Sequence, residues 1–275
     1  MIRLAIAGAA GRLGRTVLDL AGRTNSFEIV CGLVAPAGSK SVQFIQAGDR
    51  RVPLRETLDE ECDILLDVSV PLGTSAWVDF CEHREISMVI GVTGHSDKQM
   101  TRIQEAAHQI PILFAANFSI GINAILQLLA PLMGQLGPGY DVEIVEAHHR
   151  GKVDAPSGTA LALAEELRRA AGQDSDRDSL VFGRQGQAGP RPIGEIGIHS
   201  VRMGDIVGQH EIHFSGPGET VTIRHAAHSR ETFAAGALRA VQWIVGKGAG
   251  FYTMRDVLAV ASTPEPGIRE PDPGI

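Results

Sequence analysis

Residues 2–14 have the sequence I-R-L-A-I-A-G-A-A-G-R-L-G, and the fold of the N-terminal part of the chain can be predicted from them. Ile2 to Ala7 form a short apolar run without regular polar alternation, which is typical of a strand buried on both faces of a parallel sheet. From Leu13 to Arg23 the apolar residues follow helical spacing. A strand, a glycine turn and a helix in this order are the context of a dinucleotide-binding fingerprint. The glycines allow a tight turn, the approach of a pyrophosphate and close packing of the helix on the strand.

The alternation of strands and helices continues after this first helix. Further strands are expected at Phe27–Val34, Asp63–Val68, Ser87–Val92 and Pro111–Ala115, and helices at Thr74–His83 and Asp97–Ala107. Such alternation predicts an α/β fold with a doubly wound parallel sheet of the Rossmann type. Ligands of these sheets bind beyond the carboxyl ends of the strands. The turns that fall at these ends are Gly8–Leu13, Gly91–Thr93 and Ala115–Phe118.

The pattern changes after residue 119, where an apolar helix is expected at Ile120–Leu136. The strands that follow are expected to form a second, α+β domain with a mostly antiparallel sheet, and they lie at Tyr140–Val145, Ile193–Arg202, Ile206–Phe214 and Glu219–His225. A final helix is expected from Ser229 to Val245. Gln173–Arg191 is predicted to be a long mobile loop, and the tail after Thr263, rich in Pro, Gly and charge, is predicted to be disordered.

Ionisable side chains and helix-start signals are concentrated in Glu146–Thr159, E-A-H-H-R-G-K-V-D-A-P-S-G-T. This stretch leaves a predicted strand and enters a helix expected at Gly158–Ala171. Pro156 suits the start of that helix, and Ser157 is a candidate N-cap. Backbone N–H groups and hydroxyls of Ser157, Gly158 and Thr159 would then lie at the positive end of the helix dipole, which suits a carboxylate.

His148, His149 and Lys152 precede that helix start. Adjacent side chains leaving a strand point to opposite sides, so the two histidines do not chelate one metal ion from one face, and no metal site is expected. An acid–base function is favoured, because histidine titrates near neutrality and a lysine near other cations or in a buried site loses its proton more easily. The alternative is a solvated basic loop beside an ordinary capped helix.

Composition excludes several classes of protein. The 275 residues include 44% hydrophobic and 21% charged residues, as in ordinary globular proteins. The formal charge of −7 argues against nucleic acid as a partner. Cys31, Cys62 and Cys81 match neither a zinc spacing nor a disulfide framework, so we expect reduced thiols in a cytoplasmic protein. The N-terminal apolar run is too short for a signal peptide, and no stretch has the length of a membrane span.

The run His148–Thr159, H-H-R-G-K-V-D-A-P-S-G-T, closely resembles the signature of the 4-hydroxy-tetrahydrodipicolinate reductase (dihydrodipicolinate reductase) family. The turn G-A-A-G-R-L-G is similar to the family's G-x-x-G-R-[ML]-G pattern, and the resemblance extends to about Ala261. It implies NAD(P)H-dependent reduction of a small cyclic dicarboxylate in lysine and diaminopimelate biosynthesis. Hydride would be delivered to ring carbon C4 of a conjugated imine, and the neighbouring carbon would then be protonated.

The resemblance also implies roles for particular residues. Lys152 would be the proton donor and His148 its acid–base partner, while His149, Ser157, Gly158 and Thr159 would bind the substrate. The cofactor would lie against three turns and the end of the second strand, namely Gly8, Ala9, Ala10, Gly11, Arg12, Leu13, Val34, Ala35, Gly91, Val92, Thr93, Ala115, Ala116, Asn117 and Phe118.

The cofactor region also departs from the family pattern. Val34 and Ala35 lie where members often carry an acidic or a basic residue, and Val70 lies where they tend to have Arg. Without an acid to bind the 2′-OH of NADH or to repel the 2′-phosphate of NADPH, we expect use of both cofactors. Arg12 and Lys40, which could reach a 2′-phosphate, predict a small preference for NADPH.

By resemblance, residues 1–119 and 229–275 form the dinucleotide-binding domain, and residues 120–228 form the substrate-binding and oligomerisation domain of a homotetramer. Two alternatives remain. One is another imine-reducing enzyme, such as a diaminopimelate or aspartate dehydrogenase, although these lack the H-H-R-x-K-x-D-A-P-S-G-T run. The other is a non-catalytic dinucleotide sensor on the same fold, which would have no reason to keep both His148 and Lys152.

Overall fold

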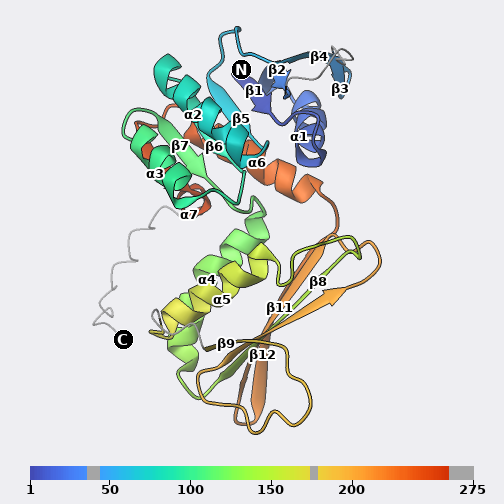
Figure 1. Cartoon of the computed structure of the whole chain (residues 1–275), viewed down its shortest axis with the longest axis vertical. Helices are drawn as coiled ribbons and strands as arrows, with labels where there is room; N and C mark the ends of the chain where they lie inside the picture. Colours follow the sequence, from blue (N-terminus) through green and yellow to red (C-terminus); the bar gives the residue numbers. More distant parts are fainter. Residues whose placement is uncertain (36–43, 174–178, 260–275) are drawn as a thin grey trace, which may run out of the picture.

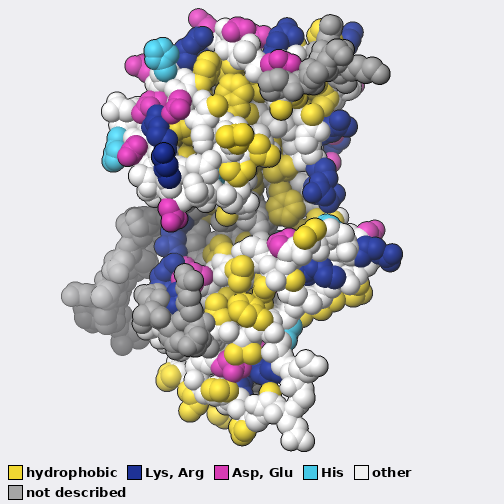
Figure 2. Space-filling view, in the orientation of Figure 1, with side chains coloured by type: hydrophobic (Ala, Val, Ile, Leu, Met, Phe, Trp, Pro, Cys, Tyr) yellow, Lys and Arg dark blue, Asp and Glu magenta, His cyan; other side chains and the backbone are white. Residues whose placement is uncertain are grey.

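The chain folds into two domains, each built on one sheet, in a computed structural model that describes residues 1–35, 44–173 and 179–259 (Figure 1). This confirms the predicted α/β fold with a second α+β domain. Lys40, part of the expected loop at 173–191 and the tail after Thr263 lie outside the described residues. On the face shown in Figure 2, charged side chains of both signs are interspersed with hydrophobic ones over both domains.

The first domain contains an eight-stranded sheet with the order β13-β7-β6-β5-β1-β2-β4-β3. Its neighbouring strands are parallel except for the hairpin of β3 and β4. The strands are β1 (Ile2–Ala7), β2 (Phe27–Leu33), β3 (Phe44–Ala47), β4 (Arg50–Arg55), β5 (Ile64–Asp67), β6 (Ser87–Ile90), β7 (Pro111–Phe114) and β13 (Gly250–Thr253). Helices α1 (Arg12–Gly22) and α6 (Glu231–Ile244) cover one face, and α2 (Pro71–Arg84) and α3 (Asp97–Ala106) cover the other.

The central strand β1 shows why its sequence lacks polar alternation. Leu4 and Ile6 pack in the core beneath α1 and α6, whereas Ala5 and Ala7 pack in the core beneath α2 and α3. All of these side chains are buried, so both faces of the strand must be apolar. The prediction of a strand buried on both faces is therefore confirmed.

The turn after β1 requires glycine for two different reasons. Gly8 has a φ of 81°, in the left-handed region that glycine adopts without steric cost. A Cβ atom on Gly14 would overlap the carbonyl oxygen of Gly8, so only glycine lets α1 pack this closely on the turn. These contacts bring the first turn of α1 to the carboxyl end of β1, as the fingerprint predicts.

The second domain contains a five-stranded sheet with the order β12-β11-β8-β10-β9. The strands are β8 (Asp141–His148), β9 (Leu180–Phe182), β10 (Ile196–Arg202), β11 (Gly208–Gly216) and β12 (Glu219–Ala227). Strand β11 pairs antiparallel with β12 and with β8, and the β11–β12 ladder is the longest of the sheet. The sheet is mixed because β10 pairs in parallel with β8 and β9. Helices α4 (Ile120–Leu136) and α5 (Gly158–Ala170) lie side by side on one face (Figure 1).

Several short elements were not expected from the sequence. The β3–β4 hairpin contains Pro53, and proline within a run argues against a strand. β13 and helix α7 (Met254–Leu258) follow the last expected helix, and β13 adds to the sheet only by pairing with β7. β9 lies in the segment predicted to be a loop, where Leu180–Phe182 pair with β10.

None of the helices in the described ranges is both long enough and apolar enough to cross a membrane.

Candidate active site

The candidate site is built at the end of β8 and the start of α5. β8 continues to His148 instead of ending at Val145 as expected, so His148 is the last residue of the strand and not part of the loop. Alternate residues of a strand share one face. Val142 and Ile144 pack against α4 and α5, and this alternation places Glu146 and His148 on the same buried face.

Glu146 is fully buried and accepts hydrogen bonds from three different elements. Its Oε2 atom lies 2.5 Å from Nδ1 of His148, and its Oε1 atom accepts the backbone N–H of Ser157 at 3.1 Å. Arg202, at the end of β10, donates to both carboxylate oxygens at 2.7 and 2.8 Å. Burial favours the neutral acid, but the hydrogen bonds from Arg202 and His148 outweigh it and lower the pKa of Glu146 to about 2. The carboxylate is therefore ionised at neutral pH.

Ser157 is the N-cap of α5, as predicted. Its hydroxyl accepts the N–H of Ala160 at 3.1 Å and lies 3.2 Å from Nε2 of His210 on β11. The expectation of a free backbone N–H at Ser157 is wrong, because Glu146 already accepts that group. Among the hydrogen bonds of the described residues, none uses the N–H of Gly158 or Thr159. The backbone N–H groups that remain open at this helix start are thus those of Gly158 and Thr159.

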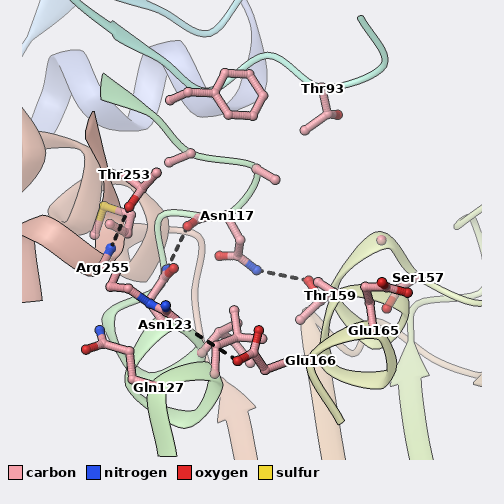
Figure 3. Close-up of a pocket in the computed structure, with 18 of the residues that line it drawn as sticks. Thr93, Asn117, Asn123, Gln127, Ser157, Thr159, Glu165, Glu166, Thr253 and Arg255 are labelled. Atoms are coloured by element: carbon pink, nitrogen blue, oxygen red, sulfur yellow. Dashed lines mark hydrogen bonds and ion pairs between the residues drawn. The ribbon is translucent and has the colours of Figure 1, made fainter. Parts of the chain in front are cut away.

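Thr159 connects the two domains. Its hydroxyl oxygen accepts a hydrogen bond at 2.9 Å from the side-chain amide of Asn117, which lies in the loop after β7 (Figure 3). The amide is oriented because the Asn117 side-chain oxygen accepts the N–H of Ser119 at 2.8 Å. A residue expected near the cofactor therefore contacts a residue expected near the substrate.

A cavity of about 740 Å³ lies between the two domains, with α5 along one wall. The first domain contributes Thr93, Ala115, Ala116 and Asn117 from the predicted cofactor set. The second domain contributes His148, Lys152, Ser157, Gly158 and Thr159, which are all the predicted catalytic and substrate-binding residues except His149. The cavity is also lined by residues that were not predicted, including Asn123, Gln127, Glu165, Glu166, Thr253 and Arg255 (Figure 3).

A second cavity of about 440 Å³ joins the glycine turn to the loop after β8. Its lining includes Arg12 and Leu13 from the turn, together with His148, His149 and Lys152. Val207, Arg230 and Phe233 complete it. His148 and Lys152 line both cavities, so the two predicted catalytic residues lie between the glycine turn and the start of α5.

The remaining predicted cofactor residues line neither cavity: Gly8, Ala9, Ala10, Gly11, Val34, Ala35, Gly91, Val92 and Phe118. Ala9, Val92 and Phe118 are buried in the hydrophobic cores, so their side chains are packing residues. Gly11 is the N-cap of α1 and has no capping side chain. The N–H groups at the start of α1 are consequently left without a side-chain acceptor, which fits the pyrophosphate of a dinucleotide.

The electrostatic state of the predicted catalytic residues follows from their neighbours. Burial lowers the pKa of His148, although the contact with Glu146 raises it, so His148 is neutral near pH 7. The ammonium of Lys152 lies 2.8 Å from the carboxylate of Asp154, which is exposed. Because Asp154 is exposed, water can hydrate its carboxylate when Lys152 turns away from it toward a bound ligand.

Sequence reasoning missed the roles of Glu146, Arg202 and His210. A charged residue in phase with Val142 and Ile144 indicates a buried, paired carboxylate, and this signal was available for Glu146. Arg202 and His210 are distant in sequence and reach the site only through the register of β10 and β11 with β8. Within the described ranges, no group of three or more His, Cys, Asp or Glu side chains could hold a metal ion.

Family models and known proteins match this chain over nearly its whole length. Residues 2–118 match the family model described as dihydrodipicolinate reductase, N-terminus, and residues 121–258 match the model for its C-terminus. A 4-hydroxy-tetrahydrodipicolinate reductase from Myxococcus xanthus is 40% identical over 272 residues, covering 96% of this chain and 100% of that protein. One from Acinetobacter baumannii is 40% identical over 265 residues, covering 94% and 96%. The dipicolinate-bound dihydrodipicolinate reductase from Paenisporosarcina sp. TG-14 is 26% identical, with a TM-score of 0.75 and coverage of 94% and 100%.

Proposed function

The chain belongs to the dihydrodipicolinate reductase family, and on that premise we propose how its residues divide the reaction between them. Its activity is the NAD(P)H-dependent reduction of 4-hydroxy-tetrahydrodipicolinate in lysine and diaminopimelate biosynthesis. The substrate is a cyclic dicarboxylate that becomes a conjugated imine on loss of water. Bound NAD(P)H supplies the hydride for ring carbon C4, and the protein supplies binding, geometry and the proton for the adjacent carbon.

One substrate carboxylate binds at the start of α5 in this proposal. The N–H groups of Gly158 and Thr159 donate to it, and the positive end of the helix dipole favours its charge. The Thr159 hydroxyl already accepts a hydrogen bond from Asn117, so its own proton is left to donate to the carboxylate. Ser157 acts through the cap that holds this helix start in place, and His149 adds a donor from the second cavity.

Lys152 donates the proton and His148 is its acid–base partner. The observation that carries this assignment is that both residues line both cavities, between the glycine turn and the carboxylate-binding helix start. The charge of Lys152 also attracts the dianionic substrate. A ligand carboxylate in the larger cavity would compete with Asp154 for the ammonium and direct it toward the ring.

The test of this assignment is Lys152→Ala. Loss of a general acid typically lowers the rate about 10²–10⁴-fold, and we expect kcat to fall by that factor while the fold is retained. The oxidation of NAD(P)H with enzymatically made substrate gives the rate, and circular dichroism checks the fold. Arg150→Ala is the matched control, because Arg150 is an exposed neighbouring cation that lines neither cavity. A Lys152→Ala enzyme with near-normal kcat would refute the assignment.

The family uses NAD(P)H, and we assign its dinucleotide to the second cavity with its pyrophosphate at the uncapped start of α1. Neither Val34 nor Ala35 can bond a ribose hydroxyl through its side chain or repel a phosphate. Arg12 lines this cavity and is exposed, so it favours a 2′-phosphate only weakly.

We therefore expect both cofactors to be used, with a preference for NADPH of less than about tenfold that fades as salt rises. Values of kcat/KM for NADH and NADPH at low and high ionic strength measure this preference, and Arg12→Gln should abolish it. A strong, salt-insensitive preference for NADH would show that another group binds the ribose.

The domain roles and the assembly are part of the same proposal. Residues 1–119 and 229–275 form the dinucleotide-binding domain, and residues 120–228 form the substrate-binding domain. The proposed homotetramer assembles through the sheet of the second domain, whose outer strands β12 and β9 each pair with one neighbour among the described residues. We place the enzyme in the cytoplasm, consistent with three cysteines that are all free.

A further inference from the structure

We propose that Glu146 is a positioning residue that fixes His148 and the start of α5 in one geometry. The proposal rests on the proposed function of His148 and of Gly158 and Thr159, and it adds the group that holds them together. Glu146 lies at the back of the site, fully buried, and its carboxylate contacts His148, Ser157 and Arg202.

The carboxylate determines which nitrogen of His148 carries the proton. Arg202 donates two hydrogen bonds to Glu146, so the group is ionised and can only accept. The contact of 2.5 Å with Nδ1 of His148 therefore requires a proton on Nδ1. In the neutral ring, Nε2 is then the unprotonated nitrogen, and it is available to a reacting group.

The same carboxylate also positions the carboxylate-binding helix start. Its other oxygen accepts the Ser157 N–H, one of the donors that an uncapped α5 would offer to a ligand. Gly158 and Thr159 are left as the donors for the substrate. Glu146 contacts both ends of the loop between His148 and Ser157. Arg202 balances the negative charge of Glu146 and holds the middle of this loop by donating to the backbone carbonyl of Asp154.

Replacement by Gln retains the size of Glu146 but cannot satisfy its partners. The native carboxylate accepts two hydrogen bonds from Arg202, one from His148 and one from Ser157, and a hydrogen bond from the Ser200 side chain also helps to lower its pKa. A Gln side chain has one acceptor oxygen and an NH₂ group that must itself donate. We expect Glu146→Gln to favour the other tautomer of His148 and to lower kcat about 10²-fold or more, because acid–base catalysis depends on the position of that proton. KM should change less than kcat.

The pH profile separates positioning from general structural damage. Removing an anion beside a histidine destabilises its charged form and lowers its pKa. The limb of the kcat profile that reports His148 should therefore move to lower pH in Glu146→Gln. Glu146→Asp retains the charge and should recover part of kcat and the wild-type position of that limb.

Glu143→Gln is the matched control. Glu143 lies on the same strand, binds two arginines and a histidine, and lines neither cavity. Its replacement should leave kcat, KM and the pH profile unchanged. A fall in kcat of similar size in Glu143→Gln would show that any disturbance of β8 has this effect, and it would overturn the proposal.

A measurement on the wild-type protein tests the tautomer without any substitution. The ¹⁵N chemical shifts of labelled His148 should show a protonated Nδ1 and an unprotonated Nε2 near pH 7. A proton on Nε2 would overturn the proposal, as would a Glu146→Gln enzyme with wild-type kcat and pH profile. Failure of the proposed function would instead be seen as unchanged kcat in Lys152→Ala, whatever Glu146 does.

Discussion

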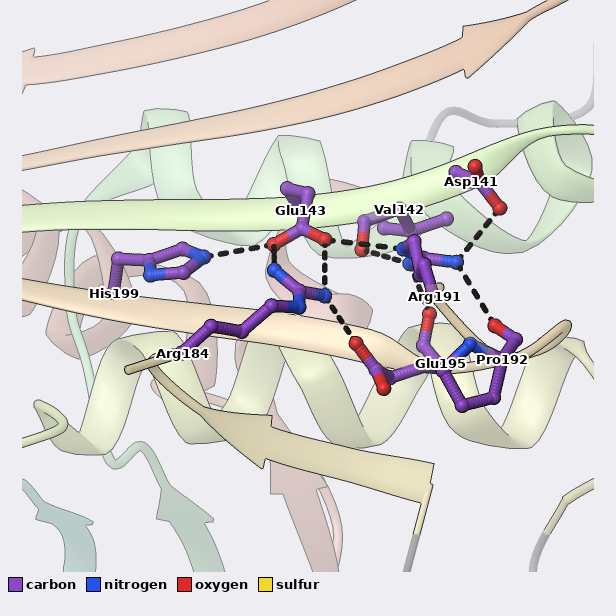
Figure 4. Close-up of polar contacts among 8 residues, drawn as sticks. All are labelled: Asp141, Val142, Glu143, Arg184, Arg191, Pro192, Glu195 and His199. Atoms are coloured by element: carbon purple, nitrogen blue, oxygen red, sulfur yellow. Dashed lines mark hydrogen bonds and ion pairs between the residues drawn. The ribbon is translucent and has the colours of Figure 1, made fainter. Parts of the chain in front are cut away.

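Strand β8 carries two glutamates whose surroundings are chemically similar, and they lie on opposite faces of the sheet. Glu146 binds Arg202 and His148 on the face beneath α5. Glu143 binds Arg184, Arg191 and His199 on the other face (Figure 4). Although burial favours the neutral acid in both cases, hydrogen bonds from the arginines and the histidine lower the pKa of each glutamate to about 2.

The two clusters differ in the number of carboxylates that each arginine contacts. Arg184 also pairs with Glu195, and Arg191 also pairs with Asp141, so each arginine on the Glu143 side has a second acceptor. Arg202 has Glu146 as its only carboxylate partner among the ion pairs of the described residues. Glu143 is 26% exposed, whereas Glu146 is 0% exposed. The same kind of ion pair therefore occurs in two settings on one strand. Around Glu143 it holds a partly exposed segment, and around Glu146 it surrounds the histidine that we propose it positions.

The largest expected difference between the faces is in stability. Glu146→Ala leaves Arg202 without its carboxylate, and breaking a buried pair typically costs about 3 kcal/mol or more of the free energy of unfolding. Glu143→Ala should cost about 1 kcal/mol or less, because Arg184 and Arg191 keep Glu195 and Asp141. Urea denaturation of both variants measures the difference. Equal losses of stability would show that Glu195 and Asp141 do not compensate Arg184 and Arg191 for the loss of Glu143.

A smaller difference is expected from salt. Screening acts strongly on partly exposed charges and weakly on buried ones, since the Debye length falls from about 10 Å at 0.1 M to about 3 Å at 1 M. The cost of Glu143→Ala should therefore shrink toward zero between these salt concentrations, while the cost of Glu146→Ala should persist. Denaturation curves at both concentrations give the two values. A salt-sensitive penalty at Glu146 would mean that water reaches that carboxylate.

Much of the fold could be predicted because long, repetitive elements carry their own signal. The buried strand β1, the glycine turn and the alternation that follows specify a parallel sheet before any tertiary contact is known. The β3–β4 hairpin, β9 and β13 could not be predicted, because these strands form only where a neighbouring strand offers hydrogen bonds. Pairing of this kind is a property of the assembled sheet and leaves little trace in a short sequence.

The candidate site likewise contains residues that could be predicted from the sequence and contacts that could not. Residues adjacent in the chain, from His148 to Thr159, could be identified together because the motif is local. The use of the Ser157 N–H by Glu146, the two hydrogen bonds from Arg202 and the contact of Asn117 with Thr159 could not, since each joins distant segments. The contacts that position the motif are therefore less visible in sequence than the motif itself.

Gly197 on β10 lies against the cluster formed by Glu143, Arg184, Arg191 and His199, and this contact limits which residues can occupy position 197. A Cβ atom at this position would overlap the carboxylate of Glu143, which two arginines and a histidine hold in place. Glycine is favoured at position 197 because a side chain would clash with Glu143, and not because of the backbone, which has ordinary strand conformation. A larger residue at position 197 would therefore push the Glu143 carboxylate away from its arginine and histidine partners, so Gly197 and this ion-pair cluster depend on each other.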